Sequence, residues 1–224
     1  MALAATLALE RDRPLVVLPG GTLNHLARDL RIERAEDALD ALASGEVVGV
    51  DVAKIDDRVF VNTAGFGIYP ELLAVSARLQ PWLGRWGGHG AALLKTLISA
   101  RPLDLTIDGR RRSVWMGYVG NCRHEPDGLA PTWRPRLDDE ALDVRLLVAD
   151  LPRSRLRALL AALSGRLPRS KAYEQYETAR LRVESAQPGL TLAQDGDHFD
   201  GHGTFTVEKP AARLLVHARH EPGA

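Results

Sequence analysis

The apolar positions of the first 45 residues follow the order helix, short strand, helix, helix. Residues 1–11 are rich in Ala and Leu, and residues 15–18 form a continuous apolar run between turn residues, as a buried parallel strand does. Apolar residues recur at helical spacing over 22–30, and another helix is expected over about 33–43. This order is typical of a nucleotide-binding α/β unit.

From residue 46 onward the pattern changes to many short alternating runs separated by turn residues, which favours a β-sandwich. Helices are expected within it at about 70–80, 88–99 and 153–164. The predicted fold is therefore mixed α+β: a partial α/β nucleotide-binding half at residues 1–45, followed by a β-sandwich domain with a few helices at residues 46–224. Because about 45 residues are too few to bury the core of an α/β layer, part of the first half is expected to be missing.

Composition narrows the class of protein. With 45% hydrophobic and 26% charged residues, the chain is typical of a soluble globular protein. Its 29 basic and 29 acidic residues cancel, so no overall field would hold nucleic acid. Cys122 is the only cysteine, which excludes an intrachain disulfide and fits the cytoplasm, and no apolar run approaches the ~20 residues of a membrane span. The oligomeric state stays open.

A glycine turn is the first candidate for chemistry. Gly20 and Gly21 lie where the predicted strand ends, and Thr22 can cap the helix that follows. Backbone N–H groups and the positive end of a helix dipole meet at such a junction and suit a phosphate. A plain strand–turn–helix connection explains the same residues equally well.

Two acidic segments are the other candidates. Residues 138–140 place three carboxylates in a predicted loop, which could bind a hard divalent cation or be a solvated turn. Asp195-Gly196-Asp197 is first of all a strong hairpin-turn signal. A carboxylate there could also take a proton from a substrate hydroxyl.

Five segments resemble, in order, the diacylglycerol kinase catalytic domain family, which covers bacterial lipid kinases, with sphingosine and ceramide kinases as relatives. They are PLVVLPGGTLNHLARDL (14–30), VFVNTAGFGIYPE (59–71), WMGYVGNC (115–122), PRLDDEALDV (135–144) and LAQDGDHF (192–199).

The resemblance implies ATP-dependent phosphorylation of a lipid hydroxyl, of diacylglycerol or a similar lipid, with Mg²⁺. It places Gly20, Gly21, Thr22 and Asn24 at the nucleotide, and it assigns the metal to Asp139 with the backbone carbonyls of Arg136 and Ala141. It makes Asp197 the base, with Asp195 the next candidate. Glu140 stands where the family usually has Gly, and Asp197 where it has Glu.

The family's opening strand and its Gly-Gly-Asp-Gly-Thr loop, which cradles ATP, have no counterpart in the sequence. We therefore expect weak ATP binding by the chain as given, and inactivity is an open alternative. A rival interpretation is a non-catalytic lipid- or partner-binding module derived from a lipid kinase.

The helix expected near 153–164 carries Arg153, Arg155 and Arg157 beside an apolar stripe that includes Leu160. Packing of its leucines on the sandwich is the favoured interpretation, and peripheral contact with an anionic membrane, at its inner face, is the second. Trp82 and Trp86 are likewise expected in the core or in the wall of an apolar groove, with an interfacial anchor as the second interpretation.

Overall fold

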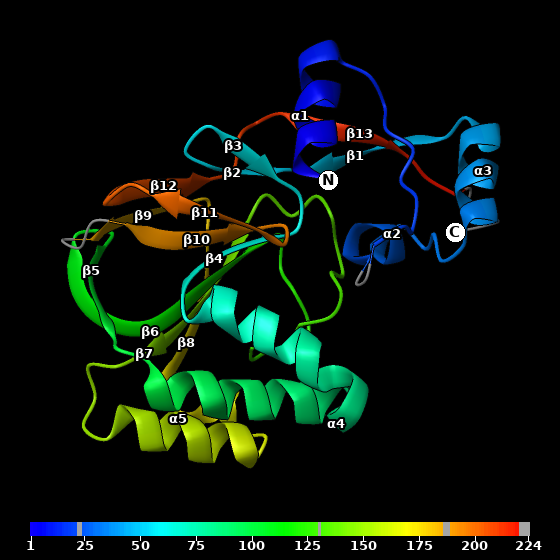
Figure 1. Ribbon diagram of the computed structural model, residues 1–224. Helices are drawn as coiled ribbons and strands as arrows, with labels where there is room; N and C mark the ends of the chain where they lie inside the picture. Colours follow the sequence, from blue (N-terminus) through cyan, green and yellow to red (C-terminus); the bar gives the residue numbers. More distant parts are fainter. Residues whose placement is uncertain (22–23, 130, 186–188, 220–224) are drawn as a thin grey trace.

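The computed structural model describes residues 1–21, 24–129, 131–185 and 189–219, apart from the side chains of residues 85, 86 and 89 (Figure 1). Thr22 and the side chain of Trp86 thus lie outside the described residues. The helices are α1 (Ala2–Arg11), α2 (His25–Asp29), α3 (Ala35–Ser44), α4 (Tyr69–Ser99), α5 (Ser154–Leu163) and the 3₁₀ turn η1 (Leu167–Arg169). The strands are β1 (Val47–Asp51), β2 (Ala53–Ile55), β3 (Arg58–Phe60), β4 (Thr63–Gly67), β5 (Leu103–Ile107), β6 (Arg110–Asn121), β7 (Leu142–Val148), β8 (Tyr173–Thr178), β9 (Arg180–Ser185), β10 (Leu190–Gln194), β11 (Asp197–Gly201), β12 (Thr204–Glu208) and β13 (Arg213–His217).

The long strand β6 organises an antiparallel sheet that branches. One edge of β6 pairs with β7, which continues to β8, whereas the other edge is shared by β5 and β4. From β5 the sheet runs on through β9, β12, β2 and β3, and from β4 through β10 and β11. The sheet curls (Figure 1), and apolar side chains of both branches share one buried cluster that includes Phe60, Phe66 and Phe205. The mixed α+β class is confirmed, and the sandwich is built from one continuous curled sheet.

The N-terminal helices share a second buried cluster with the β1–β13 ribbon. Ala5, Leu26 and Ile32 pack there with Val50 and Leu214. Residues on both sides of position 45 thus contribute to one cluster, and the domain boundary near residue 45 stays a prediction.

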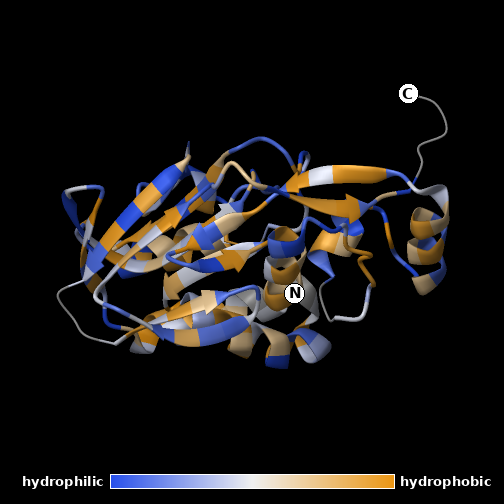
Figure 2. Cartoon of the chain, turned by 90° about the horizontal axis from the view of Figure 1, so that it is seen from above, coloured by the Kyte–Doolittle hydropathy of each residue, from blue (hydrophilic) through white to orange (hydrophobic). Residues whose placement is uncertain are grey.

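Helices α4 and α5 form a layer against the sheet, seen below it in Figure 1. Leu93, Leu97 and Ala158 share a third buried cluster with Met116 and Leu147. Figure 2 shows hydrophobic and hydrophilic positions alternating along the strands, as expected where each face of a sheet has its own environment. No helix among the described residues is long and apolar enough to cross a membrane.

A β-bulge interrupts β6. Val114 pairs with Val148 and Met116 with Leu147, so Trp115 is an additional residue in the ladder. Before the bulge Val114 faces the cluster shared by the two branches of the sheet, whereas after it Met116 faces the cluster under α4.

Three elements differ from the sequence expectation. Residues 15–18 form no strand but one parallel bridge from Leu15 to Val216, and Val16 and Leu18 are exposed, because no described strand covers their other side. The helix predicted from Thr22 begins three residues later, at His25. The two helices predicted at 70–80 and 88–99 are the halves of α4, which bends at the left-handed Gly84 (φ 68°).

Candidate active site

Asp195 clamps the segment that leads into β4. In the turn between β10 and β11, its carboxylate accepts the N–H groups of Val61 (2.9 Å), Asn62 (2.8 Å) and Thr63 (3.0 Å). The N–H of Asp195 in turn donates to the carbonyl of Thr63 at 2.8 Å. The residue is left-handed (φ 48°) and is followed by Gly196, so the turn aims this side chain at the neighbouring strand. Asp195 is thus a positioning residue.

Asp197, two residues later, is different. It begins β11, pairs with Gln194 across the hairpin and is exposed. Its carboxylate has no hydrogen-bonding partner among the described residues. The turn therefore holds one carboxylate that is bound to the segment at 61–63 and, two residues later, one that is exposed.

A buried arginine that sequence reasoning missed joins the clamped segment at 61–63 to α2. The guanidinium of Arg134 lies 2.7 Å from the carboxylate of Asp29, the last residue of α2. The same guanidinium donates to the carbonyl of Val61 (2.7 Å) and to Oδ1 of Asn62 (3.2 Å). Asn62 is therefore fixed through its backbone by Asp195 and through its side chain by Arg134. One arginine among many, in a loop, offers no sequence signal for this role.

Asn121, at the end of β6, extends the network on the other side. Its N–H donates to the carbonyl of Asn62 at 2.9 Å, and its Nδ2 donates to the carbonyls of Val61 and Asp51, both at 2.7 Å. The amide thus links the clamped segment to β1 and, through β1, to the acidic loop.

Aromatic and imidazole rings lie near the clamped segment. Tyr69 and Tyr118 meet edge to face at 5.5 Å between ring centroids, and Tyr118 and His124 at 5.8 Å. Burial raises the pKa of Tyr69 to about 12 and that of Tyr118 well above its usual value. Burial also lowers the pKa of His124 and, on α2, of His25. These groups are neutral near pH 7, so they add no charge beside the Arg134–Asp29 ion pair.

The glycine turn is held by Asn24. Its Oδ1 accepts the N–H of Gly21 at 2.6 Å, and its Nδ2 donates to the carbonyl of Pro19 at 3.2 Å. A Cβ on Gly20 would meet no atom within 4 Å, so the backbone there stands open to its surroundings. Asn24 thus shapes the turn, while contact of these residues with a nucleotide stays a prediction.

The acidic loop is fixed by its own backbone. The carboxylate of Asp139 accepts the N–H groups of Arg123 (2.7 Å) and Ala141 (3.0 Å). The carbonyl of Ala141 accepts another N–H, from Cys122 at 3.0 Å. Glu140 is left-handed (φ 59°), a conformation that favours glycine. The strain expected from Glu in place of Gly is therefore present.

Asp51, Cys122 and Asp139 bring three potential ligand atoms within 4.8 Å of one another. However, the Lys209 ammonium already lies 3.0 Å from the Asp51 carboxylate and 3.5 Å from the Cys122 sulfur. Burial raises the pKa of Cys122 to about 12, so the sulfur is a protonated thiol, which hard Mg²⁺ does not favour. This cluster does not fit Mg²⁺, since a divalent ion would be repelled by Lys209. The assignment of Mg²⁺ to Asp139 with the carbonyls of Arg136 and Ala141 stays a prediction.

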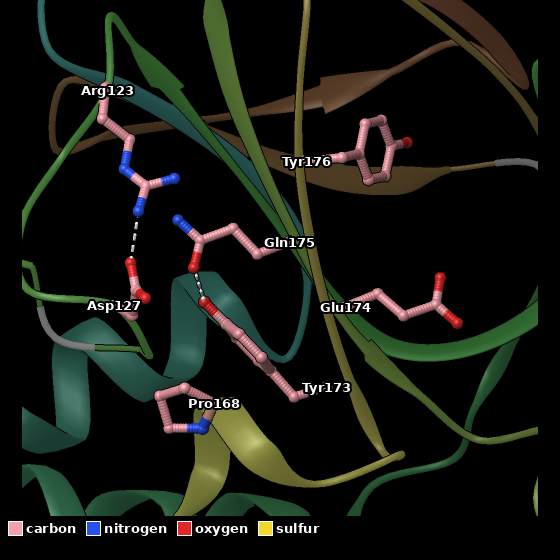
Figure 3. Close-up of a pocket in the computed structure, with 7 residues that line it drawn as sticks. All are labelled: Arg123, Asp127, Pro168, Tyr173, Glu174, Gln175 and Tyr176. Atoms are coloured by element: carbon pink, nitrogen blue, oxygen red, sulfur yellow. Dashed lines mark hydrogen bonds and ion pairs between the residues drawn. The ribbon is translucent and has the colours of Figure 1, made fainter.

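A pocket of about 550 Å³ lies beside β8 and is lined in part by Arg123 (Figure 3). On one side of it Arg123 and Asp127 form an ion pair, and Tyr173 donates to Oε1 of Gln175 at 2.7 Å. The charge of Arg123, the cation that lines this pocket, is therefore neutralised by Asp127, which lines the same pocket. We do not place the reaction there.

Comparisons with known proteins identify relatives of this chain. Residues 1–55 match the model of the diacylglycerol kinase catalytic domain. A Pseudomonas aeruginosa protein named "Probable lipid kinase YegS-like" is 29% identical over 94% of this chain and 72% of its own length. A diacylglycerol kinase of Bacillus subtilis is 33% identical over 43% of this chain and 33% of its own length.

Solved structures share the fold. A crystal structure of a diacylglycerol kinase from Bacillus anthracis aligns with a TM-score of 0.60 at 16% identity, over 94% of this chain and 68% of that one. A second Bacillus anthracis structure with diacylglycerol kinase in its name gives 0.65 at 21% identity, over 95% and 71%. The resemblance expected from the motifs is confirmed: this chain is a homologue of the YegS-like lipid kinases and the diacylglycerol kinases, which are kinase transferases.

Proposed function

We propose that the protein is an ATP-dependent lipid kinase that phosphorylates the hydroxyl of diacylglycerol or a similar lipid. The observation that carries the proposal is the turn at 195–197, in which a clamped carboxylate positions the backbone while a free one stands beside it. Homology to lipid kinases supports the substrate class.

In this mechanism Asp197 accepts the proton of the lipid hydroxyl. The hydroxyl oxygen forms a bond to the γ-phosphorus of ATP, the bond from that phosphorus to the bridging oxygen breaks, and ADP leaves. Asp195 and Arg134 hold Asn62 next to the reacting groups. The open turn at Gly20 and Gly21, shaped by Asn24, approaches the phosphates. Mg²⁺ would accompany the ATP and neutralise its phosphate charge.

The test is transfer of labelled phosphate from ATP to diacylglycerol in mixed micelles, with the full chain. Asp197→Asn should lower kcat by about 10²–10⁴-fold with little change in the KM for ATP, because it removes a basic oxygen and keeps the shape. Asp197→Glu, the residue usual in the family, should keep activity. Asp200→Asn, on the same exposed strand, is the matched control and should leave kcat unchanged.

Two results would contradict the proposal. If Asp197→Asn keeps more than about half of the wild-type kcat, it is not the base. If the folded wild-type chain transfers no phosphate to any lipid hydroxyl while still binding lipid, the non-catalytic module is the better interpretation.

A further inference from the structure

Helix α5 presents its leucines outward, contrary to the packing that the sequence favoured. Leu156, Leu160 and Leu163 are 52%, 58% and 69% exposed. The inward side consists mainly of small residues, and Ala158 is buried in the cluster beneath. Of the four leucines in the stripe, Leu159 alone packs against that cluster. We call the three exposed leucines the apolar ridge.

One of the arginines of α5 faces inward and fixes the helix in this orientation. The guanidinium of Arg155 donates to the carbonyls of Ile98 (2.9 Å) and Ala100 (2.8 Å), at the C-terminal end of α4. It also lies 4.8 Å from the centre of the Trp115 ring. The contacts of Arg155 therefore fix α5 in the orientation that exposes the ridge.

A shallow concavity of about 420 Å³ adjoins the ridge at Leu160. Its lining contains four cationic side chains, and no acidic residue lines it among the described residues. We call these four the basic rim: Arg157, Arg166, Arg169 and Lys171. Trp82, 86% exposed, and the exposed Ile98 add apolar area on α4, so the tryptophan is not in the core.

We propose that the ridge and the rim dock the protein on an anionic phospholipid bilayer. Exposed leucines can enter the interface between headgroups and acyl chains, and surrounding cations are attracted to anionic lipids. Helix α3 provides the contrast: its exposed Leu39 and Leu42 are accompanied by three acidic residues, Glu36, Asp37 and Asp40. Arg34 and Arg219 pair with two of them, so this face has no excess positive charge to attract such a surface. Charge complementarity therefore selects the α5 side.

This inference rests on the proposed function, because a lipid kinase must reach a substrate that resides in a bilayer. Helix α4 connects the two places. It begins at Tyr69, whose hydroxyl is 3.5 Å from that of Thr63 in the clamped segment. Near its other end, the carbonyl of Ile98 accepts a hydrogen bond from Arg155 of α5. A bilayer on the ridge would thus lie against the helix layer that leads to the candidate site.

The test is cosedimentation of the full chain with phosphatidylcholine vesicles, with and without phosphatidylglycerol. The wild type should bind vesicles that contain phosphatidylglycerol, and added salt should weaken this binding. Arg166→Gln with Arg169→Gln should lower the partition coefficient about 30-fold. Arg110→Gln with Arg111→Gln, two exposed arginines at the start of β6, should leave it unchanged.

The apolar half of the surface is tested in the same way. Leu160→Ser with Leu163→Ser should reduce binding by at least tenfold, since it removes the groups that enter the interface. Leu39→Ser with Leu42→Ser on α3 is the matched control and should bind as the wild type does. All four substituted residues are exposed, so circular dichroism and Tm should match the wild type.

Equal binding of the wild type to both kinds of vesicle, or wild-type binding by the double variants of the ridge and of the basic rim, would overturn the proposal. In the second case a protein partner would become the better occupant of the face. Sedimentation does not depend on catalysis, so a wild-type chain that phosphorylates micellar lipid but does not bind vesicles containing phosphatidylglycerol refutes the docking surface alone. Intact vesicle binding without phosphorylation refutes the proposed function alone.

Discussion

The carboxylate of Asp29 and the guanidinium of Arg134 meet at 2.7 Å with side chains that are only 2% and 1% exposed. Asp29 ends the first helix after the glycine turn, and Arg134 reaches onward to Val61 and Asn62. The pair is thus the direct link between the proposed nucleotide side and the proposed hydroxyl side of the site.

Arg134→Met should lower the free energy of unfolding by about 3–5 kcal/mol, because it leaves Asp29 buried without its partner. Urea denaturation measures the change. The control is Arg34→Met, which breaks the exposed pair of Arg34 with Glu36 and should cost less than about 1 kcal/mol. A loss of less than about 1 kcal/mol for Arg134→Met would show that the link carries little of the stability.

Asp195 and Asp197 should separate stability from activity. Asp195→Asn turns an NH₂ group toward a backbone N–H that now donates to a carboxylate, and should cost about 1–3 kcal/mol of unfolding free energy as well as activity. Asp197→Asn should stay within about 0.5 kcal/mol of the wild type while losing activity. Equal unfolding free energies for the two variants would contradict the clamp.

The buried imidazole of His124 predicts acid sensitivity. Burial, with Arg134 and Arg145 nearby, places its folded pKa well below the usual 6.5, so the unfolded chain binds a proton first as the pH falls. Stability should therefore be full above about pH 6.5 and decline below it. Thermal unfolding across that range checks this. His124→Asn, which can keep a donor toward the carbonyl of Cys122, should show a flatter profile; an unchanged slope would assign the effect to other groups.

Lys209 is the buried cation of the Asp51 cluster, and the half-exposed Arg213 also pairs with Asp51, at 3.3 Å. Lys209→Gln removes an ammonium whose side chain, like that of Asp51, is 5% exposed, and should cost about 3 kcal/mol, the low end for a buried pair because Arg213 remains. Lys95→Gln, at an exposed position on α4, should be neutral.

The acidic loop at residues 138–140 can be tested for Mg²⁺ binding by measuring Tm at increasing Mg²⁺ concentration. If Asp139 binds Mg²⁺ with the carbonyls of Arg136 and Ala141, Mg²⁺ should raise the Tm of the wild type and not that of Asp139→Asn. Equal responses of the two proteins would contradict this ligand assignment.

Much of the secondary structure could be predicted from the local spacing of apolar residues in the sequence. Helical periodicity predicted the helices at about 70–80, 88–99 and 153–164 within a few residues of α4 and α5, because the spacing of apolar residues is a local property. The strand at 15–18 failed because one apolar run forms a strand only when a neighbour supplies its hydrogen bonds.

The candidate site shows the same division. Motif order located the carboxylates at 195, 197 and 139, but not the difference between a clamped Asp195 and a free Asp197. Arg134 and Lys209 were not predicted, because a buried charge is defined by partners more than 60 residues away in sequence. The leucines of α5 were expected to pack on the sandwich, but three of them are exposed. Helical periodicity shows which residues share a face of the helix, but it does not show whether that face points to the core or to solvent.

The bulge at Trp115 determines which length changes this protein can tolerate. On one side of it the even-numbered Val114 enters the core between the sheet branches, and on the other side the odd-numbered Val119 does so, while Tyr118 faces the helices. Deleting any one residue between 116 and 120 would turn the remainder of the strand inside out against both of its neighbours there, β4 and β7. Gaps among diverging relatives should therefore avoid that stretch, and where one does fall in β6 it should coincide with the bulge itself.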